Sequence, residues 1–258
     1  MKLSIGGVMK KAVSGLTGKW LTVLLSLAAT LCAFFRVMVV SEAAEYSAAL
    51  TLDYVADEKT REAMLSNLYT VITVMSAAAT LLVAVPISVG FKRVILLSVR
   101  DENPSFADLF WCYSLRRLIR TAGLKFTVAI KLFLWTALFI IPSYLSYHII
   151  NGFAAEWIAV YVKYLLIGIG VCVFAVKLVS YSAVDFIFIQ NEEMKSREII
   201  KKSTSNFGLH GEAFGKTALL YLALAPIILT CLLIFPLFYV IPFVFACVAV
   251  NTDTIINP

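Results

Sequence analysis

Four side chains that could do chemistry lie inside long apolar stretches of the sequence. Lys177, Tyr181 and Asp185 are spaced four residues apart, so a helix would carry all three on one face. Lys131 lies in the preceding apolar stretch. Charges in hydrocarbon are costly and often mark a site, so these residues predict either a polar patch on a substrate pathway or a structural ion pair. We favour an ion pair, for instance Asp185 with Lys131, because it uses one charge of each sign.

The other charges in apolar stretches lie nearer to their ends. Arg36 and Lys163 are close to the predicted outer ends, from which long side chains can reach water. Lys125 is close to an inner end, and Lys131 lies about two helical turns further in. Lys177 lies closer to the middle of the membrane.

Recognised catalytic and metal-binding motifs do not occur in the sequence. It contains no Gly-Lys-Ser phosphate loop, no nucleophile elbow and no HExxH zinc motif. The two histidines, His148 and His210, are far apart. The five cysteines are scattered singly, and as small apolar residues they predict neither disulfide nor metal site; they are Cys32, Cys112, Cys172, Cys231 and Cys247. We therefore expect no catalytic residues, no cofactor and no metal, and a protein that is not an enzyme.

The composition places the chain in a membrane. Hydrophobic residues make up 61% of its 258 residues and charged residues 15%, against about half and a quarter in soluble domains. The apolar residues form runs of about 20 or more, the length that a helix needs to cross about 30 Å of hydrocarbon. The sequence predicts an all-α, polytopic membrane bundle, formed as one integral membrane domain over residues 1–258. The predicted spans are residues 20–40, 68–92, 123–148, 157–189, 217–235 and 236–250.

Two of the apolar runs do not match the thickness of one bilayer. The second apolar run is too long for the bilayer, so its last part, with Lys92 and Arg93, is expected to emerge from the membrane. Residues 217–250 are long for one span and short for two. We expect a tight helical hairpin that breaks near Pro236 and gives six spans, with the C-terminus on the side of the N-terminus. A single kinked helix would give five spans and the opposite side.

Basic residues concentrate on alternate connections. The N-terminal segment and the connections after the second and fourth runs are basic, whereas residues 41–66 carry six acidic side chains. The positive-inside rule therefore predicts a cytoplasmic N-terminus in a cell membrane. The net charge of +6 then indicates anionic lipid rather than nucleic acid. The expected partners are membrane lipids and other membrane proteins.

Each basic segment forms an amphipathic stretch before a span, predicted at residues 3–18, 103–120 and 194–207. In the second stretch, Asn103 is the predicted N-cap with Pro104 at the first helical position. Gly208 is the predicted end of the third. Such helices either lie in the membrane interface or cover their own bundle, and both alternatives stay open. The residues expected to contact lipid headgroups are Lys10, Lys11, Arg116, Arg117, Arg120, Lys201 and Lys202.

The order of amphipathic helix, span and span occurs three times. Val83-Ala84-Val85 corresponds to Phe174-Ala175-Val176 at an offset of 91 positions, and an acidic pair follows both. A parallel internal repeat would explain this pattern. Alternating apolar runs and basic loops occur in any multi-span protein, so the simpler interpretation also stays open.

Short motifs from about residue 80 onward resemble a known family. They are, in chain order, Gly90, Arg100, Pro104-Ser105-Phe106-Ala107-Asp108-Leu109-Phe110, Leu134-Trp135, Ile140-Ile141-Pro142, Tyr181-Ser182, Arg197-Glu198-Ile199-Ile200-Lys201-Lys202-Ser203, Gly211, Phe214 and Pro242. This order resembles the bacterial multi-span family of domain of unknown function 975. Ser143 stands where that family prefers glycine, and Glu192-Glu193 replaces its Asn-Pro. The resemblance implies a bacterial cytoplasmic membrane and carries no established activity.

The sequence thus predicts a non-enzymatic accessory or scaffold protein that interacts with lipids or envelope proteins. The alternative is a small transporter or permease component that uses the polar face around Lys177 and Asp185.

Overall fold

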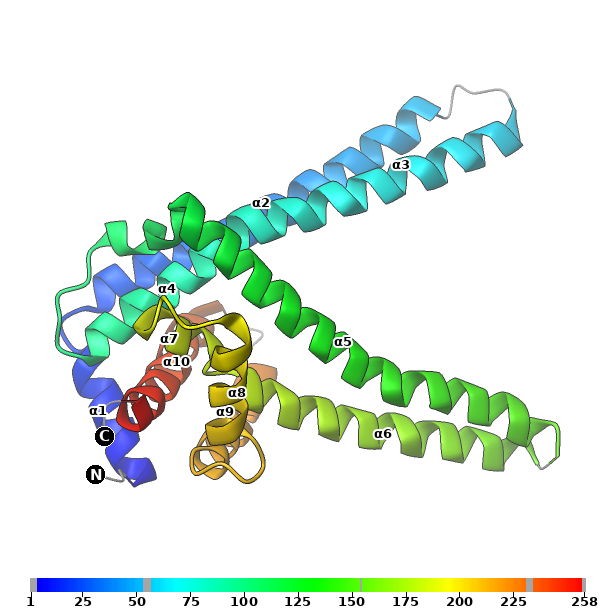
Figure 1. The fold of residues 1–258 in the computed structure, drawn as a ribbon. Coiled ribbons are helices and arrows are strands. Elements are labelled where there is room, and N and C mark those ends of the chain that lie inside the picture. Colours follow the sequence, from blue (N-terminus) through cyan, green and yellow to red (C-terminus); the bar gives the residue numbers. More distant parts are fainter. Residues whose placement is uncertain (1–3, 53–56, 154, 231–233, 257–258) are drawn as a thin grey trace. The chain divides into compact units, whose positions relative to one another are not determined.

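The computed structural model describes residues 4–52, 57–153, 155–230 and 234–256, and contains helices and no strand in these ranges (Figure 1). The all-α prediction is confirmed. The elements are α1 (Ile5–Leu16), α2 (Trp20–Leu52), α3 (Glu58–Ala79), the π-helical turn η1 (Thr80–Ala84), α4 (Val85–Val99), the 3-10 helix η2 (Phe106–Tyr113), α5 (Leu115–Asn151), α6 (Glu156–Tyr181), α7 (Val184–Gln190), α8 (Ser196–Phe207), α9 (Phe214–Thr230) and α10 (Ile234–Ile256).

Five helical stretches in the described ranges are long and apolar enough to cross a membrane. They are Trp20–Leu52, Glu58–Val99, Leu115–Asn151, Glu156–Gln190 and Phe238–Ile256. The chain is therefore a multi-pass helical membrane protein. Its contacts divide it into two compact units, residues 16–122 and residues 1–15 with 123–258.

In the unit of residues 16–122, α2 lies antiparallel to the continuous helix formed by α3, η1 and α4 (Figure 1). The Lys19 ammonium donates a hydrogen bond to the Ser98 carbonyl at 3.0 Å, and the Ser76 hydroxyl donates to the Ser41 hydroxyl at 2.9 Å. Both helices place 22 residues between these two contacts, so they keep one register over about 33 Å.

The acidic connection 41–66 is more helical than expected. The predicted spans 20–40 and 68–92 are parts of longer helices, because α2 continues to Leu52 and α3 begins at Glu58. Asp57 caps α3, since its carboxylate accepts hydrogen bonds from the hydroxyl and the backbone N–H of Thr60. These hydrogen bonds lower the pKa of Asp57 below its usual value.

The short helix η2 packs along α4 at unusually close range. Gly90 has no side chain, and the Leu109 carbonyl occupies the space that a Cβ of residue 90 would fill. The Tyr113 hydroxyl donates a hydrogen bond to the Val83 carbonyl at 3.0 Å. Cys112 is buried beside them. This close approach of two backbones explains why a glycine is needed in the middle of α4.

The start of η2 differs from the prediction. Its N-cap is Ser105 rather than Asn103, and Ser105 forms a reciprocal capping box with Asp108. Arg93 Nε donates a hydrogen bond to Asp108 Oδ1 at 3.3 Å. Burial raises the pKa of Asp108, but the hydrogen bonds from Ser105 and Arg93 outweigh it, and the pKa lies below its usual value.

The apolar side chains of η2 differ in burial. Leu109 is fully buried, whereas Phe106, Phe110 and Tyr113 are 45%, 48% and 40% exposed. Side chains at i and i+3 eclipse in a 3-10 helix, so Phe110 and Tyr113 share an exposed face, and Leu109 and Cys112 share a buried one. The backbone is extended at Ser114, where η2 ends and α5 begins.

In the other unit, α5 and α6 form a second long hairpin, and α8 packs against the C-terminal end of α6 and against α7 (Figure 1). The Ser203 hydroxyl donates a hydrogen bond to the Ser180 carbonyl at 2.7 Å. Ile199, Ile200 and Phe207 are buried, and Gly208 ends the helix as predicted. The apolar face of α8 therefore covers its own bundle, which answers for this helix the question that the sequence left open.

The helices α9 and α10 form an antiparallel pair. Asn251 Nδ2 lies 3.5 Å from Thr217 Oγ1, which brings the far ends of the two helices together. The single kinked helix is therefore wrong for this region. The break predicted near Pro236 comes earlier, because Pro236 already lies in the first turn of α10; residues 231–233 are outside the described ranges.

The two units share a local arrangement. In each, the second arm of a hairpin is followed by a short helix that packs back on it: η2 on α4, and α8 on α6 and α7. The offset of 91 positions takes Leu109 to Ile200 and Cys112 to Ser203, and all four side chains are buried. The parallel repeat itself stays a prediction, since ten residues of α4 are buried but only three of α6.

We expect Gly90→Ala to destabilise the protein, because the new methyl group must displace the η2 backbone that Tyr113 and Asp108 hold. Overpacking of this kind costs about 1–3 kcal/mol. Gly168→Ala is the matched control, since nothing lies within 4 Å of a Cβ there and alanine is the better helix former. Thermal unfolding in detergent measures both, and equal midpoints for the two variants would contradict the close contact.

Candidate functional site

The buried acid of the polar patch is paired with Lys125. The Lys125 ammonium lies 2.6 Å from Asp185 Oδ2, with the Asp185 side chain 3% exposed and that of Lys125 26%. The expected pairing with Lys131 is therefore wrong. Lys131 lies six residues further along α5, and six residues turn a side chain by about 240° and advance it by about 9 Å.

The common face predicted for Lys177, Tyr181 and Asp185 is interrupted. α6 ends at Tyr181, and Asp185 lies in the first turn of the separate helix α7. The turn between them is capped by a hydrogen bond from the Ser182 N–H to the Val179 carbonyl at 3.2 Å. The break lets Asp185 meet α5 instead of extending the row of Lys177 and Tyr181.

Lys177 and Tyr181 gather around an aromatic ring of α5. The Lys177 ammonium lies 4.2 Å from the centroid of the Trp135 ring, and the Tyr181 hydroxyl lies near the indole of the same residue. A cation over an aromatic face is stabilised by about 2 kcal/mol when it is desolvated. Trp135 was missing from the predicted site. A charge in the middle of a span needs a partner. An aromatic ring at the same depth in the neighbouring span was therefore the signal that could have identified Trp135.

The fourth residue of the predicted patch lies apart. Lys131 is on the exposed side of α5, and its ammonium has no ion-pair, hydrogen-bonding or ring partner among the described side chains. The patch therefore consists of two local pairings, Lys125 with Asp185 and Lys177 with Trp135, and excludes Lys131.

A third cation marks the opposite end of the hairpin. The Lys163 ammonium lies 4.4, 5.2 and 5.9 Å from the ring centroids of Tyr144, Tyr147 and Tyr164. Tyr144 and Tyr147 follow Lys125 by 19 and 22 residues, which is about 29–33 Å along α5. This length matches the hydrocarbon thickness of about 30 Å, and tyrosine concentrates at membrane interfaces, so the spacing of the two clusters suits the two interfaces of one bilayer.

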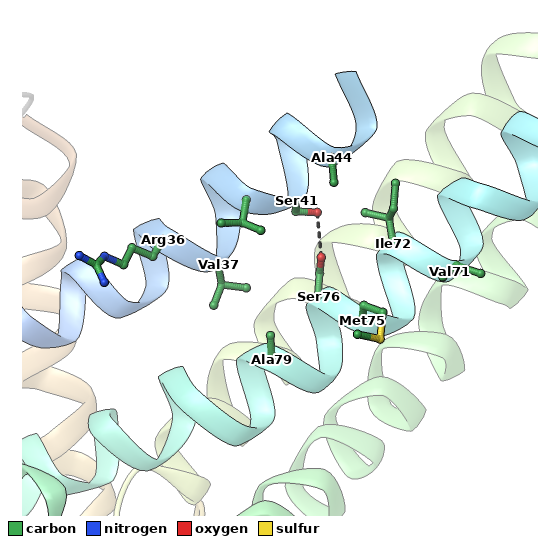
Figure 2. A pocket seen from close by; sticks show the side chains of 10 residues that line it. Arg36, Val37, Ser41, Ala44, Val71, Ile72, Met75, Ser76 and Ala79 are labelled. Atoms are coloured by element: carbon green, nitrogen blue, oxygen red, sulfur yellow. Dashed lines mark hydrogen bonds between the residues drawn. The ribbon is translucent and has the colours of Figure 1, made fainter. Parts of the chain in front are cut away.

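The hairpin of α2 and α3 holds an apolar groove of about 380 Å³. Figure 2 shows the Ser41 and Ser76 hydroxyls facing each other across it, while Arg36 points away from this pair. The other side chains around the groove are apolar: Val37, Val40, Ala44, Val71, Ile72, Met75 and Ala79. Such a lining suits hydrocarbon chains and provides no group for acid–base or nucleophilic chemistry.

The described residues contain no group of three or more histidine, cysteine, aspartate or glutamate side chains that could hold a metal ion. Cys32, Cys112, Cys172 and Cys247 are free thiols, and Cys231 lies outside the described ranges. The arrangement can stabilise charges inside a membrane, and the described side chains assemble no catalytic triad or metal centre.

The residues predicted to contact lipid headgroups lie on three elements. Lys10 and Lys11 are on α1, the three arginines are in the first two turns of α5, and Lys201 and Lys202 are on α8. All of these side chains are exposed or half-buried, with Arg116 and Lys201 among the exposed ones. Their accessibility meets the first requirement for contact with lipid.

Comparison of the chain with protein-family models, with characterised proteins and with solved structures finds no match. The resemblance to the family of domain of unknown function 975 therefore stays a prediction. The functional inference has to come from the side-chain arrangement described above.

We expect single substitutions of the ion pair to be asymmetric. Lys125→Met leaves a buried carboxylate without its cation and should cost about 3–5 kcal/mol, whereas Asp185→Asn leaves a partly exposed lysine and should cost less. The double variant Lys125→Met with Asp185→Leu should recover most of the loss, since it buries no charge. Denaturation in detergent measures the three variants.

Lys131→Met is the matched control on the same helix, and it should be close to neutral because Lys131 lies on the exposed side. A double variant as unstable as Lys125→Met alone would contradict the structural role of the pair.

Proposed function

We propose that this chain is a non-enzymatic accessory or scaffold protein of the bacterial cytoplasmic membrane, which interacts with lipids or with other envelope proteins. The observation that carries the proposal is that three lysines of the α5–α6 hairpin, Lys125, Lys163 and Lys177, engage the Asp185 carboxylate of α7 or aromatic rings of the hairpin. Lys125 pairs with Asp185, and Lys177 and Lys163 lie over aromatic rings. Charges used in this way stabilise the bundle and are not available to carry a substrate.

The outward-facing surface supports the same proposal. Large apolar side chains are exposed along both arms of the hairpin, among them Phe133 at 71%, Leu138 at 58% and Tyr161 at 65%. Exposed apolar surface of this extent needs lipid or a partner helix. A scaffold works through such surfaces rather than through an internal cavity.

A transporter or permease component is the second candidate, and the burial of Asp185 favours it. An acid inside a candidate span can hold or release a proton when its cation moves away. In this mechanism, Lys125 would be the gating partner and Lys177 the next cation along the path.

Flux measurements separate the two functions. In proteoliposomes with an internal pH-sensitive dye, we expect the wild-type protein to conduct no protons above the empty-vesicle rate. After cross-linking in native membranes, purification of this protein should recover a partner protein, and purification of that partner should recover this protein. The double variant Lys125→Met, Asp185→Leu should give the same result. Proton flux that disappears in Asp185→Asn, while the variant stays folded, would establish the transporter instead.

The proposed orientation has a cytoplasmic N-terminus, because the basic segments then lie inside and the acidic hairpin tip outside. In a variant without the five native cysteines, we expect Asp57→Cys to react with a membrane-impermeant maleimide in intact cells. Ser196→Cys should react only after the membrane is opened. The reverse pattern would invert the topology, and labelling of both sites in intact cells would rule out the two-sided arrangement.

A further inference from the structure

Trp111 of η2 holds two arginine side chains. The guanidinium carbons of Arg93 and Arg117 lie 4.8 and 4.7 Å from the centroid of its ring. Arg117 Nη1 also donates a hydrogen bond to the Trp111 carbonyl at 3.3 Å, and Arg93 Nε donates to Asp108. We call Arg93, Trp111 and Arg117 the arginine–tryptophan cluster. Three different elements supply it: α4, η2 and α5.

The cluster is strongly cationic. Arg116 and Arg120 lie beside Arg117 on the first two turns of α5. Asp108 is already engaged by the backbone and hydroxyl of Ser105 as well as by Arg93.

The position of the cluster along α5 places it near lipid headgroups. Arg117 precedes Lys125 by eight residues, which is about 12 Å along the helix, and Lys125 with Asp185 marks one edge of the hydrocarbon. The headgroup layers add about 5–8 Å on each side of a bilayer, and an arginine side chain spans the remaining distance. Tryptophan and tyrosine favour this depth.

We propose that the arginine–tryptophan cluster binds the phosphate of an anionic phospholipid in the adjacent leaflet. Planar guanidinium groups bind phosphate oxygens through two parallel hydrogen bonds, which a lysine ammonium cannot do. The Trp111 ring holds both guanidinium planes in place before the ligand arrives, so less side-chain entropy is lost on binding.

An aromatic row beside the cluster supplies the apolar part of the site. The ring centroids of Phe106 and Phe110 are 5.8 Å apart, those of Phe110 and Tyr113 are 5.9 Å apart, and the three rings are exposed on η2. A segment that combines exposed aromatic rings with arginine suits the interface of an anionic membrane. This inference rests on the proposed function, since it names the lipid class with which the protein interacts.

The test is native mass spectrometry of the full-length protein, titrated in detergent with phosphatidylglycerol or with phosphatidylcholine. We expect phosphatidylglycerol to bind about tenfold more tightly, because both lipids carry the phosphate but the arginines repel the quaternary ammonium group of phosphatidylcholine. Arg117→Gln and Arg93→Gln should each remove most of this preference. Arg117→Lys should restore only part of it. Trp111→Leu, which removes no charge, should also weaken it several-fold.

Lys59→Gln is the matched control, because it removes one exposed positive charge at the tip of the α2–α3 hairpin. Equal loss in Lys59→Gln and Arg117→Gln would overturn the proposal, as would equal binding of the two lipids by the wild-type protein. Displacement of phosphatidylglycerol by millimolar inorganic phosphate would assign the site to free phosphate instead. Unfolding midpoints show whether each variant folds. If Trp111→Leu does not fold, the result for Arg117→Gln decides the test.

The two proposals fail separately. Asp185-dependent proton flux would overturn the scaffold function and leave a measured preference for phosphatidylglycerol in place. Absence of flux together with absence of lipid preference would overturn only the arginine–tryptophan site.

Discussion

A charge that enters hydrocarbon must find a partner or reach water, and the α5–α6 hairpin is organised by this requirement. Lys125 and Asp185 solve it by an ion pair at one end, where Asp185 is almost completely buried. At the other end, the Lys163 ammonium lies over the rings of two tyrosines. Lys177, between the two ends, lies over the Trp135 ring. Each of these contacts joins α5 to α6 or to α7. The charged side chains that are costly in hydrocarbon therefore also fix the register between the helices.

The short helices depend on a second requirement, the close approach of backbones. η2 can lie against α4 because Gly90 leaves room for the Leu109 carbonyl. α8 reaches the end of α6 differently, through the Ser203 hydroxyl and the Ser180 carbonyl. Both contacts follow the second arm of a hairpin and both bury the short helix on one side. The same local arrangement therefore occurs in two units with different chemistry at the contact.

The side chains that meet these two requirements serve the fold, so function is left to the exposed surfaces. Lys125, Lys163 and Lys177 are used in stabilising the hairpin, and the groove between α2 and α3 is lined by apolar side chains, a pair of serines and Arg36. What remains accessible is the lipid-facing apolar surface and the arginines around Trp111. A protein built in this way acts by what it binds in and beside the membrane, which is why lipid and partner proteins are at the centre of both proposals.

The amino-acid sequence by itself determined the class, the all-α architecture and the end of α8. Run length and residue type are local properties, so Gly208 ended α8 as expected, and the buried face of α8 followed from the spacing of Ile199, Ile200 and Phe207. Only the tertiary structure decided which partners meet. Asp185 pairs with Lys125 rather than Lys131, and Lys177 with Trp135, because the chain turns after Tyr181 and because the register between α5 and α6 sets which side chains face each other. A register between two helices depends on packing along their whole length, and no short stretch of either helix contains that information.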